Sequence, residues 1–232
     1  MAQVPDKSVR SDVAAFLDRV AAMPTVRPAS GRRGRLLFAM DATASRQPSW
    51  DRACHLMGEM FLATRDLGGL ALSLAYYRGF GEFAATPWLT DAAEVVRRMT
   101  GVDCLGGQTQ ILRVLRHAAR QSAAERVAAL VFVGDAMEEE LDALCQAAGE
   151  MALRGTPGFF FHEGGNPAAA NAFRQLAKVS GGAYAPFDSG SADQLKELLR
   201  AVAVFAAGGR AALARLPGRA AGTIAGQLPA PR

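Results

Sequence analysis

The 232-residue sequence has few cysteines, and no part of it is both long and free of charge. Its three cysteines include no Cys-x-x-Cys pair, which argues against a disulfide framework and against a zinc cluster. The longest strongly apolar run without a charge, Leu67–Tyr77, has eleven residues. A membrane-spanning helix needs about 20. Because the N-terminal residues also lack the apolar segment of a secretory signal, we expect a cytoplasmic protein without a transmembrane helix.

Two glycine-rich nucleotide motifs are also missing. No Gly-x-Gly-x-x-Gly sequence opens a predicted helix, and no Lys-Ser or Lys-Thr pair follows Gly106-Gly107. These are the backbone elements with which Rossmann-type proteins and P-loop proteins bind phosphate groups. A nucleotide-binding function is therefore disfavoured.

Basic charge is concentrated at the two ends of the sequence. Residues 1–34 contain six basic and three acidic side chains, and residues 207–232 contain four arginines and no acid. Since the formal net charge is +4, residues 35–206 carry a net charge of −3. A nucleic-acid-binding domain usually has its basic patch on the folded body. We therefore expect neither a nucleic acid nor a membrane as the partner.

Short apolar runs alternate about six times with segments of helical periodicity, which is typical of an α/β protein. Continuous apolar runs suit strands that are buried on both faces. The sequence therefore predicts a Rossmann-like fold, with a mostly parallel central sheet and helices on both faces. The expected strands are 35–40, 70–77, 82–85, 127–133, 158–162 and 183–187. One expected helix begins at Pro48. The others cover 90–100, 109–120, 138–153, 167–179 and 191–205.

Three regions are predicted along the chain. Residues 1–34 form an N-terminal helix, over residues 11–23, and a linker rich in proline, glycine and arginine. Residues 35–206 form the α/β domain. Residues 207–232 consist mainly of alanine, glycine, arginine and proline with weak periodicity, which predicts a flexible basic tail.

Oxygen-bearing side chains follow the expected strands at one edge of the predicted sheet. Asp41, Thr43 and Ser45 follow the first strand, Asp135 follows the strand at 127–133, and Thr109 precedes a helix. In parallel α/β sheets, ligands bind beyond the carboxyl ends of the strands. Hard cations such as Mg²⁺ take oxygen ligands, and Mg²⁺ keeps several waters. These five residues are therefore candidate ligands of Mg²⁺ or Mn²⁺.

The charges of these side chains indicate a role for the ion. If the hydroxyls bind it directly, Asp41 and Asp135 act mostly through water, and the ion is poorly neutralised at contact distance. Such an ion attracts an incoming carboxylate strongly in a partly desolvated site. The three histidines lie outside these loops, so no general base is evident. The pattern favours a non-enzymatic module that captures an Asp or Glu of a partner protein.

These motifs together resemble the von Willebrand factor A (VWA) domain and its metal-ion-dependent adhesion site (MIDAS). That family has an apolar strand followed by Asp-x-Ser-x-Ser, a distant Thr before a helix, and a strand that ends in Asp. The residues that match, in that order, are Asp41, Ser45, Thr109 and Asp135. Thr43 replaces the first Ser, and Ala136 replaces the Gly of the usual Thr-Asp-Gly. The resemblance covers residues 35–206.

The resemblance implies a bacterial, cytoplasmic, stand-alone binding module whose partner offers an Asp or Glu. Members of the family often work beside ATPases or chaperones, so such a complex is a possible setting. The family resemblance also implies that the metal edge switches between two coordination states.

Two other interpretations remain open at this point. Asp41, Thr43, Ser45, Thr109 and Asp135 could simply cap turns and helices, since Asx and Ser/Thr turns use the same residue types. Alternatively, the chain could be a magnesium-dependent phosphohydrolase of haloacid-dehalogenase type that uses Asp41. That family follows its first strand with Asp-x-Asp, whereas position 43 here is Thr, so the general acid is missing.

Overall fold

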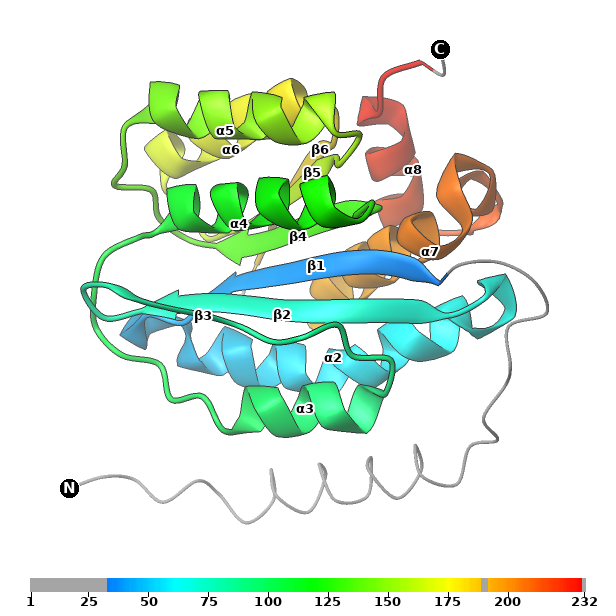
Figure 1. Ribbon diagram of the computed structural model, residues 1–232, viewed down its shortest axis with the longest axis horizontal. Coiled ribbons are helices and arrows are strands. Elements are labelled where there is room, and N and C mark those ends of the chain that lie inside the picture. The colour runs from blue at the N-terminus through cyan, green and yellow to red at the C-terminus, as the bar shows by residue number, and fades with distance from the viewer. Residues whose placement is uncertain (1–32, 189–191, 231–232) are drawn as a thin grey trace.

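The computed structural model describes residues 33–188 and 192–230, and the strands of this part form one six-stranded sheet (Figure 1). The strands are β1 (Gly34–Asp41), β2 (Leu70–Arg78), β3 (Glu82–Ala85), β4 (Ala129–Gly134), β5 (Gly158–Glu163) and β6 (Ala183–Phe187). Their order in the sheet is β3-β2-β1-β4-β5-β6. Neighbouring strands are parallel except for the antiparallel pair β2 and β3. The predicted Rossmann-like α/β fold is confirmed.

The helices expected between Pro48 and residue 205 are present with shifted ends, and further helical segments were not predicted. They are η1 (Ala44–Arg46), α2 (Gln47–Thr64), η2 (Arg65–Leu67), α3 (Ala92–Thr100), α4 (Ile111–Ala124), α5 (Leu141–Leu153), α6 (Pro167–Ser180), α7 (Ala192–Arg215) and α8 (Arg219–Gln227). The predicted helix at 11–23 lies outside the described residues. Within the described residues, no helix has the length and apolar character needed to cross a membrane.

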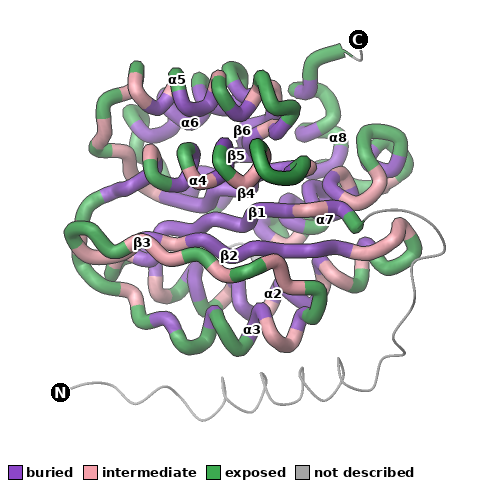
Figure 2. Tube along the Cα trace, in the orientation of Figure 1, coloured by how far each residue is buried: buried purple, intermediate pink, exposed green. Residues whose placement is uncertain are grey.

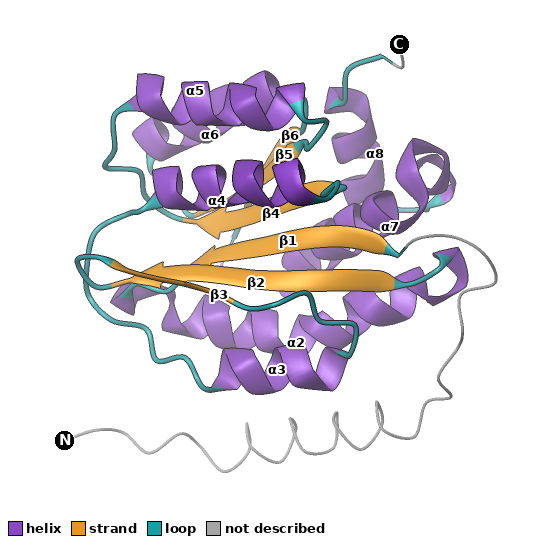
Figure 3. Ribbon diagram, in the orientation of Figure 1, coloured by secondary structure: helices purple, strands orange, loops and turns teal. Residues whose placement is uncertain are grey.

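Two layers of helices cover the sheet. Figure 3 shows α4, α5 and α6 on one face and α2, α3 and α7 on the other. Side chains alternate along β1, since successive residues of a strand point to opposite faces. Leu36, Phe38 and Met40 pack into the core beneath α2 and α7, whereas Leu37 and Ala39 pack beneath α4 and α5. The central strands are buried along their length (Figure 2).

The strand order places a switch point at β1. From β1 the chain passes to β2 on one side of it, and it later returns to β4 on the other side. Loops that leave neighbouring strands in opposite directions open a crevice at the carboxyl edge of the sheet. The residues that follow β1 and β4 lie at this crevice.

The C-terminal region is a correction to the sequence analysis. Residues 207–232 were expected to form a flexible tail, but α7 continues to Arg215 and α8 covers Arg219–Gln227. Gly209 has φ 68° and ψ −165°, so the helix changes direction there instead of ending the folded part. Ile224 is fully buried, and the Gln227 side chain bonds the backbone N–H and C=O of Tyr184 in β6. The periodicity of the sequence did not predict α8 because its alanines differ little in hydropathy from the residues of its exposed face.

We expect Ile224→Ala to lower the free energy of unfolding by about 2–5 kcal/mol, because it leaves a cavity in a packed core. Urea denaturation measures this change. The matched control is Thr223→Ala on the exposed face of α8, for which we expect a change within about 0.5 kcal/mol. Equal effects of the two variants would show that α8 does not pack on the sheet in solution.

Candidate functional site

The structure brings all five predicted ligand residues to one place. They line a single hollow of about 250 Å³ at the carboxyl edge of the sheet, beyond β1 and β4. Gly106, Gly107 and Glu138 complete most of its wall. Asp41 and Thr109 are buried in it, while Ser45 and Glu138 are exposed. We call the buried residues Asp41 and Thr109 the floor of the hollow. The exposed residues Ser45 and Glu138 belong to its rim, which reaches solvent.

Asp41 is the carboxylate of this floor. It ends β1, is 1% exposed, and accepts a hydrogen bond from the Thr43 backbone N–H at Oδ1, at 2.7 Å. Its other oxygen, Oδ2, is buried and has no hydrogen-bond partner among the described residues. Burial raises the pKa of Asp41, the bonds from Thr43 offset part of that rise, and the negative charge of Asp135 adds to it. The Tyr77 hydroxyl is also buried without a hydrogen bond among the described residues, and after burial itself the neighbouring Asp41 carboxylate is the main cause that raises the pKa of Tyr77. The protein thus holds a buried carboxylate that lies near Tyr77 and has one oxygen outside hydrogen-bond geometry.

Ser45 and Asp135 connect the loops that follow β1 and β4. Ser45 lies in η1 and donates a hydrogen bond from its Oγ to Asp135 Oδ2, at 3.1 Å. Thr43 precedes η1 with an extended backbone and makes no capping bond with its side chain. This direct contact between two of the predicted ligands spans 90 residues of sequence.

Thr109 is held by a reciprocal pair of bonds. Its Oγ1 accepts a hydrogen bond from the Glu138 backbone N–H at 3.0 Å, and its own N–H donates to Glu138 Oε2 at 3.0 Å. The loop that carries it is pressed against the β2–β3 turn, because a Cβ on Gly107 would lie 2.0 Å from the Gly79 carbonyl oxygen. Only glycine fits at such a close approach of two backbones.

The interpretation of these residues as helix caps is only partly correct. Asp41 does form an Asx-type turn with Thr43. However, α4 begins at Ile111 instead of Thr109, and the carboxylate of Glu139 accepts its Ile111 and Leu112 N–H groups at 2.6 and 2.9 Å. No side chain caps the start of α5. Thr109 and Asp135 therefore face the hollow without acting as caps.

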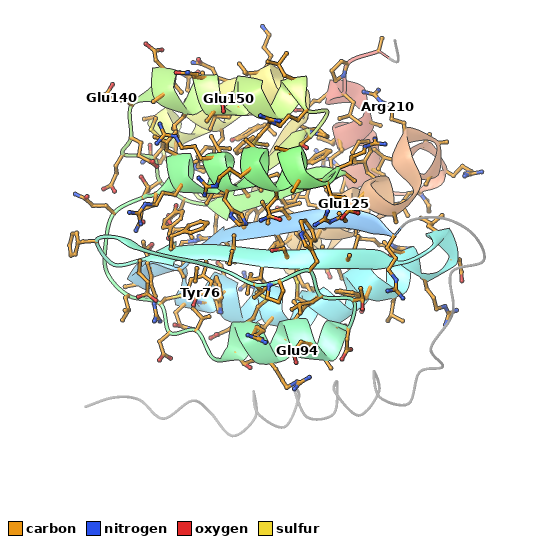
Figure 4. The ribbon with its side chains drawn as sticks, in the orientation of Figure 1. Tyr76, Glu94, Glu125, Glu140, Glu150 and Arg210 are labelled. Carbon is orange, nitrogen blue, oxygen red and sulfur yellow. The ribbon has the colours of Figure 1, made fainter. Side chains whose placement is uncertain are left out.

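Glu138 is a residue of the hollow that the sequence analysis missed. The expected helix at 138–153 would place the run Glu138-Glu-Glu140 in its first turn, but α5 begins only at Leu141. Glu138 consequently turns back to Thr109, whereas Glu140 extends away from the body at the same edge (Figure 4). The three acids that begin three residues after Asp135 are the sequence signal that could have identified this third carboxylate.

Arg46 is the second residue that was missed. It is 2% exposed, forms an ion pair with Glu163 at the end of β5, and lies 4.0 Å from Asp135 Oδ2. Ser49 donates from its Oγ to the same Glu163 carboxylate, at 2.6 and 2.5 Å. The Arg46 atoms Nε and Nη2 are buried and have no hydrogen-bond partner among the described residues. A buried positive charge thus lies directly behind Asp135.

The donor set is one of hydroxyls and carboxylates. Among the described residues, no group of three or more His, Cys, Asp and Glu side chains is placed to hold a metal ion. Three of the five predicted ligands are instead hydroxyl groups. Asp41, Asp135 and Glu138 are the three carboxylates of the hollow, no Lys or Arg side chain lines it among the described residues, and Arg46 lies 4.0 Å from Asp135 Oδ2 while it pairs with Glu163.

Comparison with known proteins identifies the fold. No family model matches the chain, and no curated protein matches its sequence. Solved structures do match. A D319A mutant of the PilB minor pilin from Streptococcus sanguinis gives a TM-score of 0.61 at 8% identity, over 82% of this chain and 65% of that one. The VWA domain of SpRpn10 gives 0.56 at 11% identity, over 74% and 95%. The chain has a VWA-like fold.

A third match supports the same assignment. An aerotolerance-related membrane protein from Bacteroides fragilis NCTC 9343, with multiple mutations to serines, gives a TM-score of 0.55 at 16% identity, over 71% of this chain and 96% of that one. Identities this low establish the shared VWA-like fold alone. They give no support to the haloacid-dehalogenase alternative, whose second acid is replaced here by Thr43.

The buried arginine generates a prediction. We expect Arg46→Met to lower the free energy of unfolding by about 3–5 kcal/mol, because Glu163 would keep a buried charge without its partner. The double variant Arg46→Met/Glu163→Gln should recover most of this loss in urea denaturation. As a control, Arg97→Met removes an exposed ion pair with Glu94 and should change stability by no more than about 1 kcal/mol. If Arg46→Met lowers the free energy of unfolding no more than Arg97→Met does, Arg46 and Glu163 do not form a buried ion pair in solution.

Proposed function

We propose that this VWA-like chain is a non-enzymatic, metal-dependent protein-binding module. In this proposal, the hollow between the loops after β1 and β4 holds Mg²⁺ or Mn²⁺ and captures an Asp or Glu of a partner protein. The observation that carries the proposal is Asp41 Oδ2, a buried carboxylate oxygen without a partner among the described residues in the wall of the hollow. Buried polar atoms are nearly always paired, so an unpaired one in a polar hollow indicates a missing ligand.

The side chains of the hollow fit a hard cation. Thr43, Ser45 and Thr109 offer neutral oxygens, and Asp41 and Asp135 offer charged ones, which are the ligand types that Mg²⁺ prefers. Zinc usually takes nitrogen or sulfur ligands as well, and no cysteine or histidine lines the hollow. The bound ion would supply a positive centre to which a partner carboxylate coordinates.

The charges near the hollow also favour a divalent ion. Asp41, Asp135 and Glu138 bring three carboxylates to the hollow, and the nearby guanidinium of Arg46 already forms an ion pair with Glu163. Like charges that share a site raise the pKa of a carboxyl, as Asp135 does for Asp41. A divalent cation would reduce this repulsion.

No imidazole lines the hollow, since His55, His117 and His162 all lie outside its wall. The binding role is proposed from the hydroxyl and carboxylate oxygens, which suit a cation that captures a partner carboxylate. A cytoplasmic location and an ATPase or chaperone complex stay predictions from the family resemblance.

We expect MgCl₂ or MnCl₂ to stabilise the protein, by about 2.7 kcal/mol when the free ion reaches roughly 100 times its dissociation constant. Asp41→Asn should lose most of this gain. Without the ion, the same variant should be more stable than wild type at neutral pH. The reason is that a carboxyl whose pKa is raised on folding destabilises the protein once pH exceeds that pKa. Thermal melts with and without EDTA measure both effects.

The matched control for this experiment is Asp103→Asn. Asp103 is an exposed acid in the same loop as Thr109, but it does not line the hollow. It should retain the full response to the ion. The proposal fails if wild type shows no response to either ion, or if Asp41→Asn responds as strongly as Asp103→Asn.

A further inference from the structure

Two exposed apolar side chains lie beside the hollow. Phe80, at the turn between β2 and β3, is 85% exposed, and Leu105, in the loop that leads to Thr109, is 45% exposed. Gly106 and Gly107, which line the hollow, directly follow Leu105. The turn and the loop extend from the same edge of the sheet, beyond the carboxyl end of β2 (Figure 1).

Both side chains are carried on backbone that the fold holds in place. The Gly79 carbonyl accepts a hydrogen bond from the Gln108 N–H at 3.2 Å, and the Leu105 N–H donates to the Ala42 carbonyl at 3.0 Å. Ala42 lies between Asp41 and Thr43, so the position of Leu105 is linked to the floor of the hollow. Because the backbone is already ordered, binding through these side chains costs little additional conformational entropy.

One positive charge without an ion pair among the described residues, that of Arg113, lies at the same turn. The Arg113 guanidinium donates to the Gly81 carbonyl at 2.6 Å and forms no ion pair among the described residues. Arg78, on the other side of the turn, donates to the Asp103 carbonyl at 2.7 Å and pairs with Glu82. The positive charge of Arg113 complements an acidic partner segment. Its attraction would add to that of the cation proposed for the hollow.

We propose that Phe80 and Leu105 form, together with the hollow, one partner-binding face. Its partner is a protein segment in which the Asp or Glu that reaches the hollow is accompanied by a large apolar side chain close to it in sequence. This inference rests on the proposed function for the acidic part of the recognition. The apolar pair selects among acidic segments, since a hollow that contacts only a carboxylate would bind all of them alike.

The test uses short fluorescein-labelled peptides on a Gly-Ser background, with binding measured by fluorescence anisotropy in MgCl₂ and in EDTA. One peptide has a central Glu between Leu and Phe, a second has Glu between serines, and a third replaces the Glu of the first with Gln. We expect the first peptide to bind wild type at least about tenfold more tightly than the second, the scale expected for burying one large apolar side chain.

Variants separate the apolar contacts from the rest of the face. Phe80→Ser and Leu105→Ser should each reduce the preference for the first peptide over the second, while leaving the binding of the second unchanged. Leu153→Ser is the control, because Leu153 is 91% exposed at the end of α5, away from the hollow. Since all three side chains are exposed, the variants should fold as wild type does, which a thermal melt checks.

The outcomes distinguish the two proposals. Equal binding of the first and second peptides, or a preference that survives Phe80→Ser and Leu105→Ser, overturns the apolar inference while the metal-dependent capture of Glu stands. Binding that is unaffected by EDTA and by the change of Glu to Gln overturns the proposed function instead. Self-association of wild type that Phe80→Ser abolishes, without peptide binding, would identify a second copy of the chain as the occupant and overturn the inference.

Discussion

The burial of one carboxylate, Asp41, at the end of the central strand β1 is the constraint on which the site depends. The apolar core on both faces of β1 fixes its backbone, and the Thr43 N–H satisfies only one of its two carboxylate oxygens. Burying an ionised group without full pairing is unfavourable, as the raised pKa of Asp41 reflects. This unfavourable burial is the observation on which the proposed metal site rests.

The buried ion pair of Arg46 and Glu163 lies next to this floor and supports it. Arg46 follows the Asp-x-Thr-x-Ser segment directly, and its pair with Glu163 connects that segment to the end of β5. Ser49, in the first turn of α2, completes the pairing of Glu163. A buried ion pair is weak evidence for stability, because desolvation offsets much of its attraction. Its value here is positional, since it holds the loop after β1 next to Asp135.

The sequence was sufficient for the fold and for five residues of the hollow. The apolar runs that became β1 and β4 are buried on both faces, so their composition alone identifies them, and the parallel topology brings Asp41 and Asp135 to one edge. Glu138 was not predicted because its role depends on α5 beginning only at Leu141. Arg46 was not predicted because its partner, Glu163, is brought to it only by the tertiary structure. The end of α7 and the whole of α8 were not predicted because alanine gives little contrast in hydropathy between a buried and an exposed face.

The site thus divides into a floor that the core imposes and a rim that the core does not require. Thr109 could not change without removing the hydroxyl that accepts the Glu138 N–H, and Gly107 could not change without disturbing the loop that it packs against β2 and β3. Phe80 and Ser45 are exposed and could change at little cost to the fold. Structures that are only 8–16% identical share this architecture with the chain, which is what an arrangement specified mainly by buried strands allows. If the proposed function holds, the rim is therefore the part that can differ between partners at little cost to the fold.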